Sequence, residues 1–264
     1  MQFSDTSTKL GLIQDAEFWT GLGDASISGN STLLAHFVRL INHHYHKVIK
    51  MILQSQDEWE FDDQNITTTY PVATRPLVAG RRDYLFGTAL WTLVVTEGNS
   101  APSAAAIKPL RIKRVDITFD GTNYYKAEPI DAGEVGLGIG NDTTVDGRFS
   151  KTKPYYDLRF NALWIYPTAS AADVTAGGKI RIEFYREPTE FTASSTTTEP
   201  GFDESYHRLL SIGASMDWAM AKGLANKNDL VGKYRELVGQ MMQDYGSKTE
   251  DRHYMFQPAY IDYT

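Results

Sequence analysis

The chain has 264 residues, no cysteine and a formal net charge of −7. Its 42% apolar and 22% charged content predict a folded protein with a sizeable core rather than a disordered one. The acidic balance argues against a general nucleic-acid binder, and the lack of cysteine excludes disulfide frameworks, thiolate metal sites and cysteine nucleophiles. The first ten residues do not resemble a signal peptide, and the longest apolar run, 90–95, is too short to span a bilayer, so we expect no membrane contact.

Two helices are predicted in the N-terminal region. Residues 8–21 have the pattern of a short amphipathic helix that buries Leu10, Ile13 and Phe18. Residues 31–54 have the clearest helical pattern in the chain, and the short link between the two segments predicts antiparallel neighbours.

The helix at 31–54 has two distinct faces. Ser31 or Thr32 can cap its start. The residues predicted to face the core are Leu34, Phe37, Val38, Ile41, Tyr45, Val48, Ile49 and Ile52. The opposite face carries a basic stripe of five residues, namely His36, Arg39, His43, Lys47 and Lys50. No Asp or Glu occurs between Asp24 and Asp57, so this face should carry positive charge outward.

The period changes from helical to extended after the second helix. Alternating or β-branched segments predict strands near 58–62, 90–96, 110–119 and 179–186, and hairpins near 110–127 and 155–166. A single helical turn is predicted at 129–134. Loops are predicted at 97–106 and 136–153, and a Ser/Thr linker at 192–199.

The helical period returns near residue 204. A helix is predicted at 204–224, with Met216 and Met220 on its apolar stripe, and Asp229 can cap a last helix. The apolar residues predicted on one face of that last helix are Leu230, Tyr234, Leu237, Val238, Met241 and Tyr245. Small residues, including Gly213, would let another helix approach closely.

The order of helices, strands and helices predicts an α+β fold. Each terminal helix displays an apolar stripe that nothing nearby in sequence can cover, so the stripes should meet. We therefore expect a helical bundle made from the N- and C-terminal helices with an inserted antiparallel β domain. The predicted parts are helices at 1–56, the β domain at 57–192, helices at 193–250 and an extended aromatic tail at 251–264.

Three patterns suggest chemistry but have simpler interpretations. His36, His43 and His46 could share a helix face, but no carboxylate lies within that helix to complete a metal site. The acidic segment 57–63 alternates with aromatic residues, as does the wet side of an exposed strand. The glycine-rich segment 136–140 lacks the GK[ST] ending of a phosphate loop. We predict no catalytic site, no metal and no cofactor.

Two surfaces are candidates for partner binding. The basic stripe is either a solvated helix face or a contact for an acidic partner surface or DNA. The aromatic tail has six large apolar residues, which either pack on this chain or dock on a partner as a linear anchor. These six are Tyr254, Met255, Phe256, Tyr260, Ile261 and Tyr263.

After the helix that precedes EWEFDD, and before the last helix, the chain contains five segments in this order: YPVATRPLVAGRRDYLF, IKRVDITFDGTNYYKAEPID, YYDLRFNALWIYP, IRIEFYREPTEF and EPGFDESYHRLLSIGASMDWAMAKGL. In this pattern of turns, aromatic residues and strand lengths the chain resembles the head-to-tail adaptor, or connector, proteins of tailed bacteriophages. The resemblance implies a structural subunit of the virion neck, assembled in the host cytoplasm, that forms a ring of commonly twelve copies beneath the portal protein.

The resemblance also implies partners. These are the portal, tail or neck proteins, other copies of the chain, and DNA that passes through the ring without sequence-specific contacts. The terminal tail of such adaptors often reaches onto the portal, which would give residues 251–264 that role. An alternative is a carbohydrate- or receptor-binding β module on a helical stalk, which exposed Trp and Tyr side chains in the β region would favour.

Overall fold

The computed structural model describes residues 1–56, 69–95, 104–131 and 146–250. Contacts divide the chain into two units. We call them the helical unit, Met1–Asn65 with Pro188–Thr264, and the β unit, Ile66–Glu187. The predicted α+β class is confirmed by helices in one unit and largely antiparallel sheets in the other.

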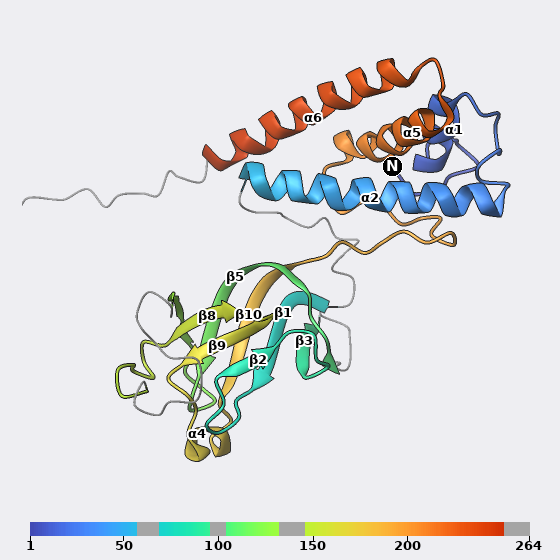
Figure 1. The fold of residues 1–264 in the computed structure, drawn as a ribbon. Coiled ribbons are helices and arrows are strands. Elements are labelled where there is room, and N and C mark those ends of the chain that lie inside the picture. Colours follow the sequence, from blue (N-terminus) through green and yellow to red (C-terminus); the bar gives the residue numbers. More distant parts are fainter. Residues whose placement is uncertain (57–68, 96–103, 132–145, 251–264) are drawn as a thin grey trace, which may run out of the picture. The chain divides into compact units, whose positions relative to one another are not determined.

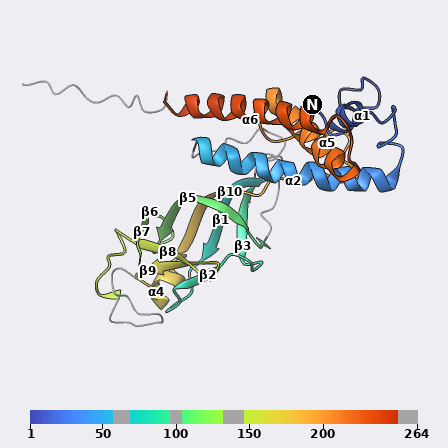
Figure 2. The same cartoon turned by 45° about the horizontal axis from the view of Figure 1, so that its top comes forward.

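The helical unit brings the N-terminal and the C-terminal helices together (Figures 1 and 2). Its elements are α1 (Leu12–Thr20), α2 (Ser31–Gln56), the 3-10 turn η2 (Glu204–Tyr206), α5 (Arg208–Lys222) and α6 (Lys227–Glu250). Helix α5 contacts α1, α2 and α6, and α2 also contacts α6. The apolar stripes of helices distant in sequence therefore cover one another.

Helix α2 buries the predicted face, but a different residue caps it. Phe37, Ile41 and Tyr45 are at most 1% exposed. The Asn30 carboxamide oxygen accepts hydrogen bonds from the backbone N–H groups of Thr32 and Leu33, at 3.0 and 3.1 Å. The prediction of Ser31 or Thr32 as the cap is therefore wrong by one residue, because Asn30 satisfies the free N–H groups of the first turn.

The predicted buried face of α1 is also wrong. Leu10 and Phe18 are 67% and 71% exposed, whereas Ile13 is buried as expected and Glu17 lies inside. The Glu17 carboxylate accepts hydrogen bonds from the backbone N–H groups of Ile27 and Ser28, both at 2.9 Å. These charge-assisted hydrogen bonds stabilise the helix orientation that buries Glu17 and leaves the neighbouring Phe18 exposed.

The C-terminal helices begin and end differently from the prediction. The segment predicted as one helix from 204 is the turn η2 followed by α5, and Met220 is exposed. Asp229 lies inside the first turn of α6 rather than before it, where its charge still favours the positive end of the helix dipole. The predicted buried face of α6 is confirmed for Leu230, Tyr234, Met241 and Tyr245.

The segment between β unit and α5 is held to α2. Phe191 exchanges two hydrogen bonds with the Asn42 side chain, at 2.8 and 2.9 Å. The Phe3 N–H donates to the Thr198 carbonyl at 2.8 Å. The predicted Ser/Thr linker at 192–199 is thus irregular in backbone but fixed in place within the helical unit.

The β unit contains two sheets with strand orders β4-β3-β1-β10-β5-β6 and β2-β9-β8-β7 (Figures 1 and 2). The first comprises β4 (Ala104–Ala105), β3 (Trp91–Val95), β1 (Thr69–Pro76), β10 (Lys179–Arg186), β5 (Pro109–Thr118) and β6 (Tyr125–Lys126). The second comprises β2 (Asp83–Leu85), β9 (Ala162–Tyr166), β8 (Tyr155–Arg159) and β7 (Glu128–Pro129). A short helix, α4 (Ala171–Thr175), starts with a capping box made by Ser170 and Asp173.

Residues from both sheets form one core, which includes Trp91, Ile117, Leu163 and Ile182. Both predicted hairpins are present, as the pairings β5–β6 and β8–β9. The register of β5 against β10 shifts around Lys113, which explains why the apolar alternation moves from even to odd positions there.

Three local predictions in the β unit need correction. Pro129 lies in β7, which pairs in parallel with β8, rather than in a helical turn. The predicted loop at 97–106 includes the short strand β4. The described part of the predicted loop at 136–153 is anchored, because the Asp146 carboxylate pairs with Arg82 at 3.0 Å and the Lys151 ammonium pairs with Asp173 at 2.7 Å. The predicted strand at 58–62 and the glycine-rich segment 136–140 lie outside the described residues.

Candidate functional site

The basic stripe lies along one exposed edge of α2. All five of its residues, His36, Arg39, His43, Lys47 and Lys50, are exposed. Their spacing of three or four residues places them on one side of a helix, and the fourteen-residue interval corresponds to about 21 Å of helix length. The structure therefore brings all five predicted stripe residues together in one line.

The stripe faces outward because the other side of α2 is committed to the core. Tyr45 is 1% exposed, its hydroxyl oxygen accepts a hydrogen bond from the Gly201 N–H at 2.7 Å, and its ring stacks on Phe191. Rotating α2 to bury the stripe would bring Tyr45 and the apolar face into water. Burial of the apolar face thus fixes the direction in which the charges point.

The stripe charges differ in their surroundings. The Lys47 ammonium lies 5.5 Å from the centre of the Tyr234 ring. Asp217 is close enough to His43 and Lys47 for their charges to help lower its pKa, although the hydrogen bond from His44 is the main cause. Within the described residues neither Arg39 nor Lys50 forms an ion pair. These two cations are the part of the stripe most available to a partner.

The buried residue His44 was not singled out by the sequence. It is 1% exposed, and its ring nitrogens lie 3.0 Å from an Asp217 carboxylate oxygen and 3.3 Å from the Tyr234 hydroxyl. Burial, followed by the charge of Asp217, raises the pKa of Tyr234 to about 12. His44 thereby joins α2 to α5 and α6 beneath the stripe, and Gly213 leaves the space that its ring occupies.

A cavity of about 390 Å³ lies beside α1 in the helical unit. Its lining includes Glu17, the exposed ring of Phe18 and the ion pair between Asp15 and Arg208, whose closest atoms are 3.2 Å apart. Trp19, next to Phe18, has the Arg208 guanidinium 5.0 Å from its ring centre. The amphipathic pattern of α1 did not predict this cavity. The cavity depends on the hydrogen bonds that hold the loop after α1 against the Glu17 carboxylate.

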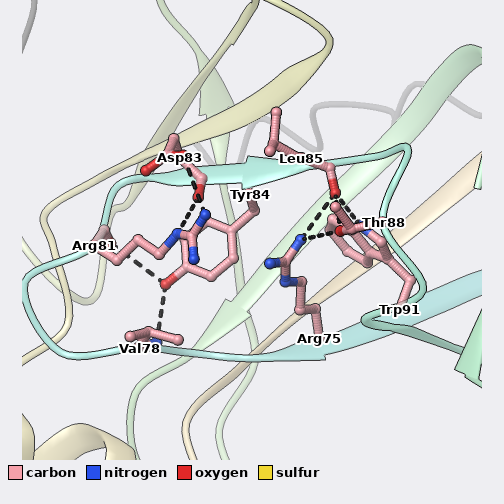
Figure 3. Close-up of polar contacts among 8 residues, drawn as sticks. All are labelled: Arg75, Val78, Arg81, Asp83, Tyr84, Leu85, Thr88 and Trp91. Carbon is pink, nitrogen blue, oxygen red and sulfur yellow. Dashed lines mark hydrogen bonds and ion pairs between the residues drawn. The ribbon is translucent and has the colours of Figure 1, made fainter. Parts of the chain in front are cut away.

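The β unit contains a buried arginine, Arg75, which is 3% exposed (Figure 3). Its guanidinium donates to the Leu85 carbonyl at 2.8 Å and lies 5.2 and 5.6 Å from the ring centres of Tyr84 and Trp91. Burial lowers the pKa of Arg75. The Trp91 indole N–H donates to the same carbonyl at 2.8 Å, so this cluster ties β2 to β1 and β3 and has a structural role.

The hairpin between β8 and β9 presents an apolar tip. Phe160 and Asn161 have φ of +51° and +56°, which is the left-handed geometry of a two-residue hairpin turn. Phe160 is 75% exposed, and a cavity of about 210 Å³ lies beside it, lined in part by Leu158 and Ile112. A large apolar residue in this conformation costs about 1 kcal/mol, and its exposed ring adds little to the core of the described β unit.

The sequence model of the SU10 adaptor protein family matches residues 9–260. The chain belongs to the SU10 adaptor protein family. The match spans both units and includes every residue of the stripe. A search of curated proteins found no match. Membership confirms the resemblance to phage head-to-tail adaptors that the order of turns, aromatic residues and strands indicated.

The family match also reaches into the aromatic tail, where it includes Tyr254, Met255, Phe256 and Tyr260 but not Ile261 and Tyr263. All six tail residues lie outside the described part of the chain, so their role stays a prediction.

The histidines of this SU10-family chain do not gather into a metal site within the described residues. No group of three or more His, Asp or Glu side chains there is arranged to hold a metal ion. His46, at the edge of the stripe on α2, instead lies 3.0 Å from Glu190. In the same part of the chain no helix has the length and apolar character needed to cross a membrane.

Proposed function

We propose that the chain is a structural, non-enzymatic subunit of a phage head-to-tail adaptor. The observation that carries this proposal is the family match over residues 9–260, which covers the helical and β units together. In this role the subunit forms a ring, of twelve copies in the arrangement common to such adaptors, seated beneath the portal in the neck of the virion. The ring joins the head to tail or neck proteins, and DNA passes through its channel.

We propose that the architecture serves this role as a helical bundle with an inserted β domain. The helices come from 1–56 and 193–250, the β domain from 57–192 and the docking tail from 251–264. The packing of α5 against α1, α2 and α6 supports this division, because it joins the two ends of the chain into one body. A bundle closed in this way leaves the β domain attached at both of its ends.

The tail residues are proposed to dock on the portal. Helix α6 ends at Glu250, so a chain that stops there loses none of the described structure. Rigid aromatic side chains contribute large contact area at low entropic cost, which suits a linear anchor.

The test compares portal binding by full-length and altered chains in a pull-down at matched concentrations. Replacing the six tail residues Tyr254, Met255, Phe256, Tyr260, Ile261 and Tyr263 by Ser should abolish binding and leave the melting temperature unchanged. A matched control replaces polar tail residues Asp251, Arg252, His253 and Gln257 by Ser and should bind portal as the wild type does. Equal binding by all three chains would refute the docking role of the tail.

A second candidate function is glycan or receptor binding by the β unit. The exposed aromatic residues Phe160 and Tyr70, at 75% and 43%, favour it. A glycan array probed with the full chain distinguishes the two proposals. The adaptor role predicts no glycan signal above that of a Phe160→Ser, Tyr70→Ser variant, whereas a signal lost in that variant would support the alternative.

A further inference from the structure

Two cations of the basic stripe, Arg39 and Lys50, have no ion-pair partner among the described residues of their own subunit. Both side chains are exposed. A helix face of this kind is either solvated or covered by a surface of opposite charge.

A surface of opposite charge exists elsewhere on the same unit. We call it the acidic cluster, and it consists of Glu199, Asp203, Glu204 and Asp244. The Asp203 N–H donates to the Tyr245 hydroxyl at 3.2 Å, and the Tyr206 hydroxyl donates to Asp244. The Met1 ammonium lies 3.2 Å from Glu204 and offsets part of the negative charge.

The carboxylates of the acidic cluster act on the pKa values of two neighbouring residues, Tyr206 and His207. Burial raises the pKa of Tyr206, and the hydrogen bond to Asp244 raises it further. Glu199 and Glu204 both act on His207, although burial dominates there and lowers its pKa. The four carboxylates therefore act on one small region at η2 and the end of α6.

The stripe and Asp203 of the acidic cluster lie on opposite sides of α2. Tyr45 is two positions from both His43 and Lys47, which places it about 160° around the helix from each of them. Tyr45 contacts Gly201 and Phe202, and the cluster residue Asp203 follows directly in the chain. The part of the acidic cluster at Asp203 therefore lies on the side of α2 opposite the stripe, so one subunit carries positive and negative charge on different faces.

We propose that the basic stripe of one copy binds the acidic cluster of the next copy. Two different faces that recognise each other form a heterologous contact, which repeats from subunit to subunit and closes into a ring when the rotation allows it. This inference deepens the proposed adaptor function and rests on it, because it names the surfaces through which the ring forms.

Charge complementarity sets the orientation of this contact more than its strength. Exposed ion pairs are weak individually and are screened by salt, so the contact should weaken as ionic strength rises. The partner is a second copy rather than DNA, because only the former gives the acidic cluster a role.

The first test uses pairwise charge reversal in the full-length chain. The stripe-reversed variant carries Arg39→Glu and Lys50→Glu. It keeps Lys47, so the contact of the Lys47 ammonium with the Tyr234 ring is unchanged. The cluster-reversed variant carries Glu199→Lys and Glu204→Lys, and a matched control carries Asp229→Lys and Glu236→Lys at exposed positions of α6. Sedimentation at low salt should show self-association roughly tenfold weaker for each reversed variant and unchanged for the control.

Mixing the two reversed variants gives the decisive result. The stripe-reversed variant sets a negative stripe against a negative cluster, and the cluster-reversed variant sets a positive stripe against a cluster whose formal charge falls from −4 to 0, so each should associate poorly with its own copies. In the mixture the unchanged stripe of the cluster-reversed variant meets the unchanged cluster of the stripe-reversed variant, so heterodimers should form with the affinity of the wild-type contact. A mixture that associates no better than its components, or reversed variants that associate like the wild type, would overturn the proposal. Loss of DNA retention by the stripe-reversed variant with unchanged self-association would also overturn it, in favour of a DNA-facing stripe.

The second test detects contacts too weak for sedimentation. The chain has no cysteine, so introduced thiols are the only ones present. Oxidation of the Lys50→Cys, Glu204→Cys variant should give a ladder of covalent oligomers, whereas the matched Lys50→Cys, Asp229→Cys variant should give none. Absence of the ladder, or an equal ladder in the control, would refute the contact. Portal binding measured in parallel separates the proposals, since it would persist if only the self-contact were wrong.

Discussion

The same substitution, Gly to Ala, should have opposite effects at two helical positions. At Gly213 in α5 a Cβ atom would lie 2.5 Å from the His44 Nδ1 atom and 2.6 Å from its Cγ atom. At Gly239 in α6 it would meet open space. Helix propensity alone favours Ala by about 1 kcal/mol at both positions.

The His44 ring cannot move aside without losing a contact. It lies within hydrogen-bond distance of Asp217 on one side and Tyr234 on the other. Overpacking of this kind costs about 1–3 kcal/mol, and a broken buried hydrogen bond adds roughly 1 kcal/mol. After subtraction of the propensity gain, Gly213→Ala should lower the free energy of unfolding by about 1–3 kcal/mol.

Thermal and urea unfolding followed by circular dichroism at 222 nm measures both variants. Each kcal/mol corresponds to about 2–4 °C in melting temperature for a protein of this size class. Gly239→Ala should raise the melting temperature, and Gly213→Ala should lower it. Equal or greater stability of Gly213→Ala would refute the view that the ring of His44 is fixed, and a double variant with His44→Ala should recover part of the loss.

Three further predictions concern buried polar groups. Glu17→Ala leaves three backbone N–H groups of the following loop without their acceptor and should cost about 3–5 kcal/mol, measured by urea unfolding, whereas Glu17→Gln should cost less. Arg75→Met should destabilise the β unit by only about 1–2 kcal/mol, since the Leu85 carbonyl keeps the Trp91 donor, and near-ultraviolet circular dichroism would show a larger loss if this is wrong. The raised pKa of Tyr234 means that its stabilising contribution is complete below pH 10 and is lost as pH rises toward 12, so Tyr234→Phe should flatten the pH dependence of the melting temperature in that interval.

The helix α2 could be predicted in detail because many apolar residues indicate the same buried face. Its apolar positions recur at helical spacing over more than five turns, and a single exception would not change the result. The stripe followed from the same pattern, since residues opposite a buried face must be exposed. The cap at Asn30 was missed by one position, because several neighbouring residues can cap a helix and only the backbone geometry chooses among them.

The short helix α1 shows why other parts could not be predicted. With two and a half turns, its apolar pattern rests on few residues, and Phe18 and Glu17 exchange their expected roles. Glu17 is buried because backbone N–H groups from residues 25 to 28 converge on it, and no periodicity in the sequence records that convergence. The His44 contacts were missed for the same reason, since both partners come from helices more than 170 positions away.

Two exposed phenylalanines, Phe18 and Phe160, are not explained by the packing of the fold. Phe18 and Phe160 contribute little to either core, and Phe160 also adopts a backbone conformation that disfavours it. At Phe160 a polar residue that tolerates the left-handed conformation should leave the β unit at least as stable. A subunit of an adaptor must contact several proteins, and rigid aromatic side chains at the surface are suited to such contacts. The helical and β units each present one of these residues, so each unit has an exposed aromatic side chain that the proposed assembly could use.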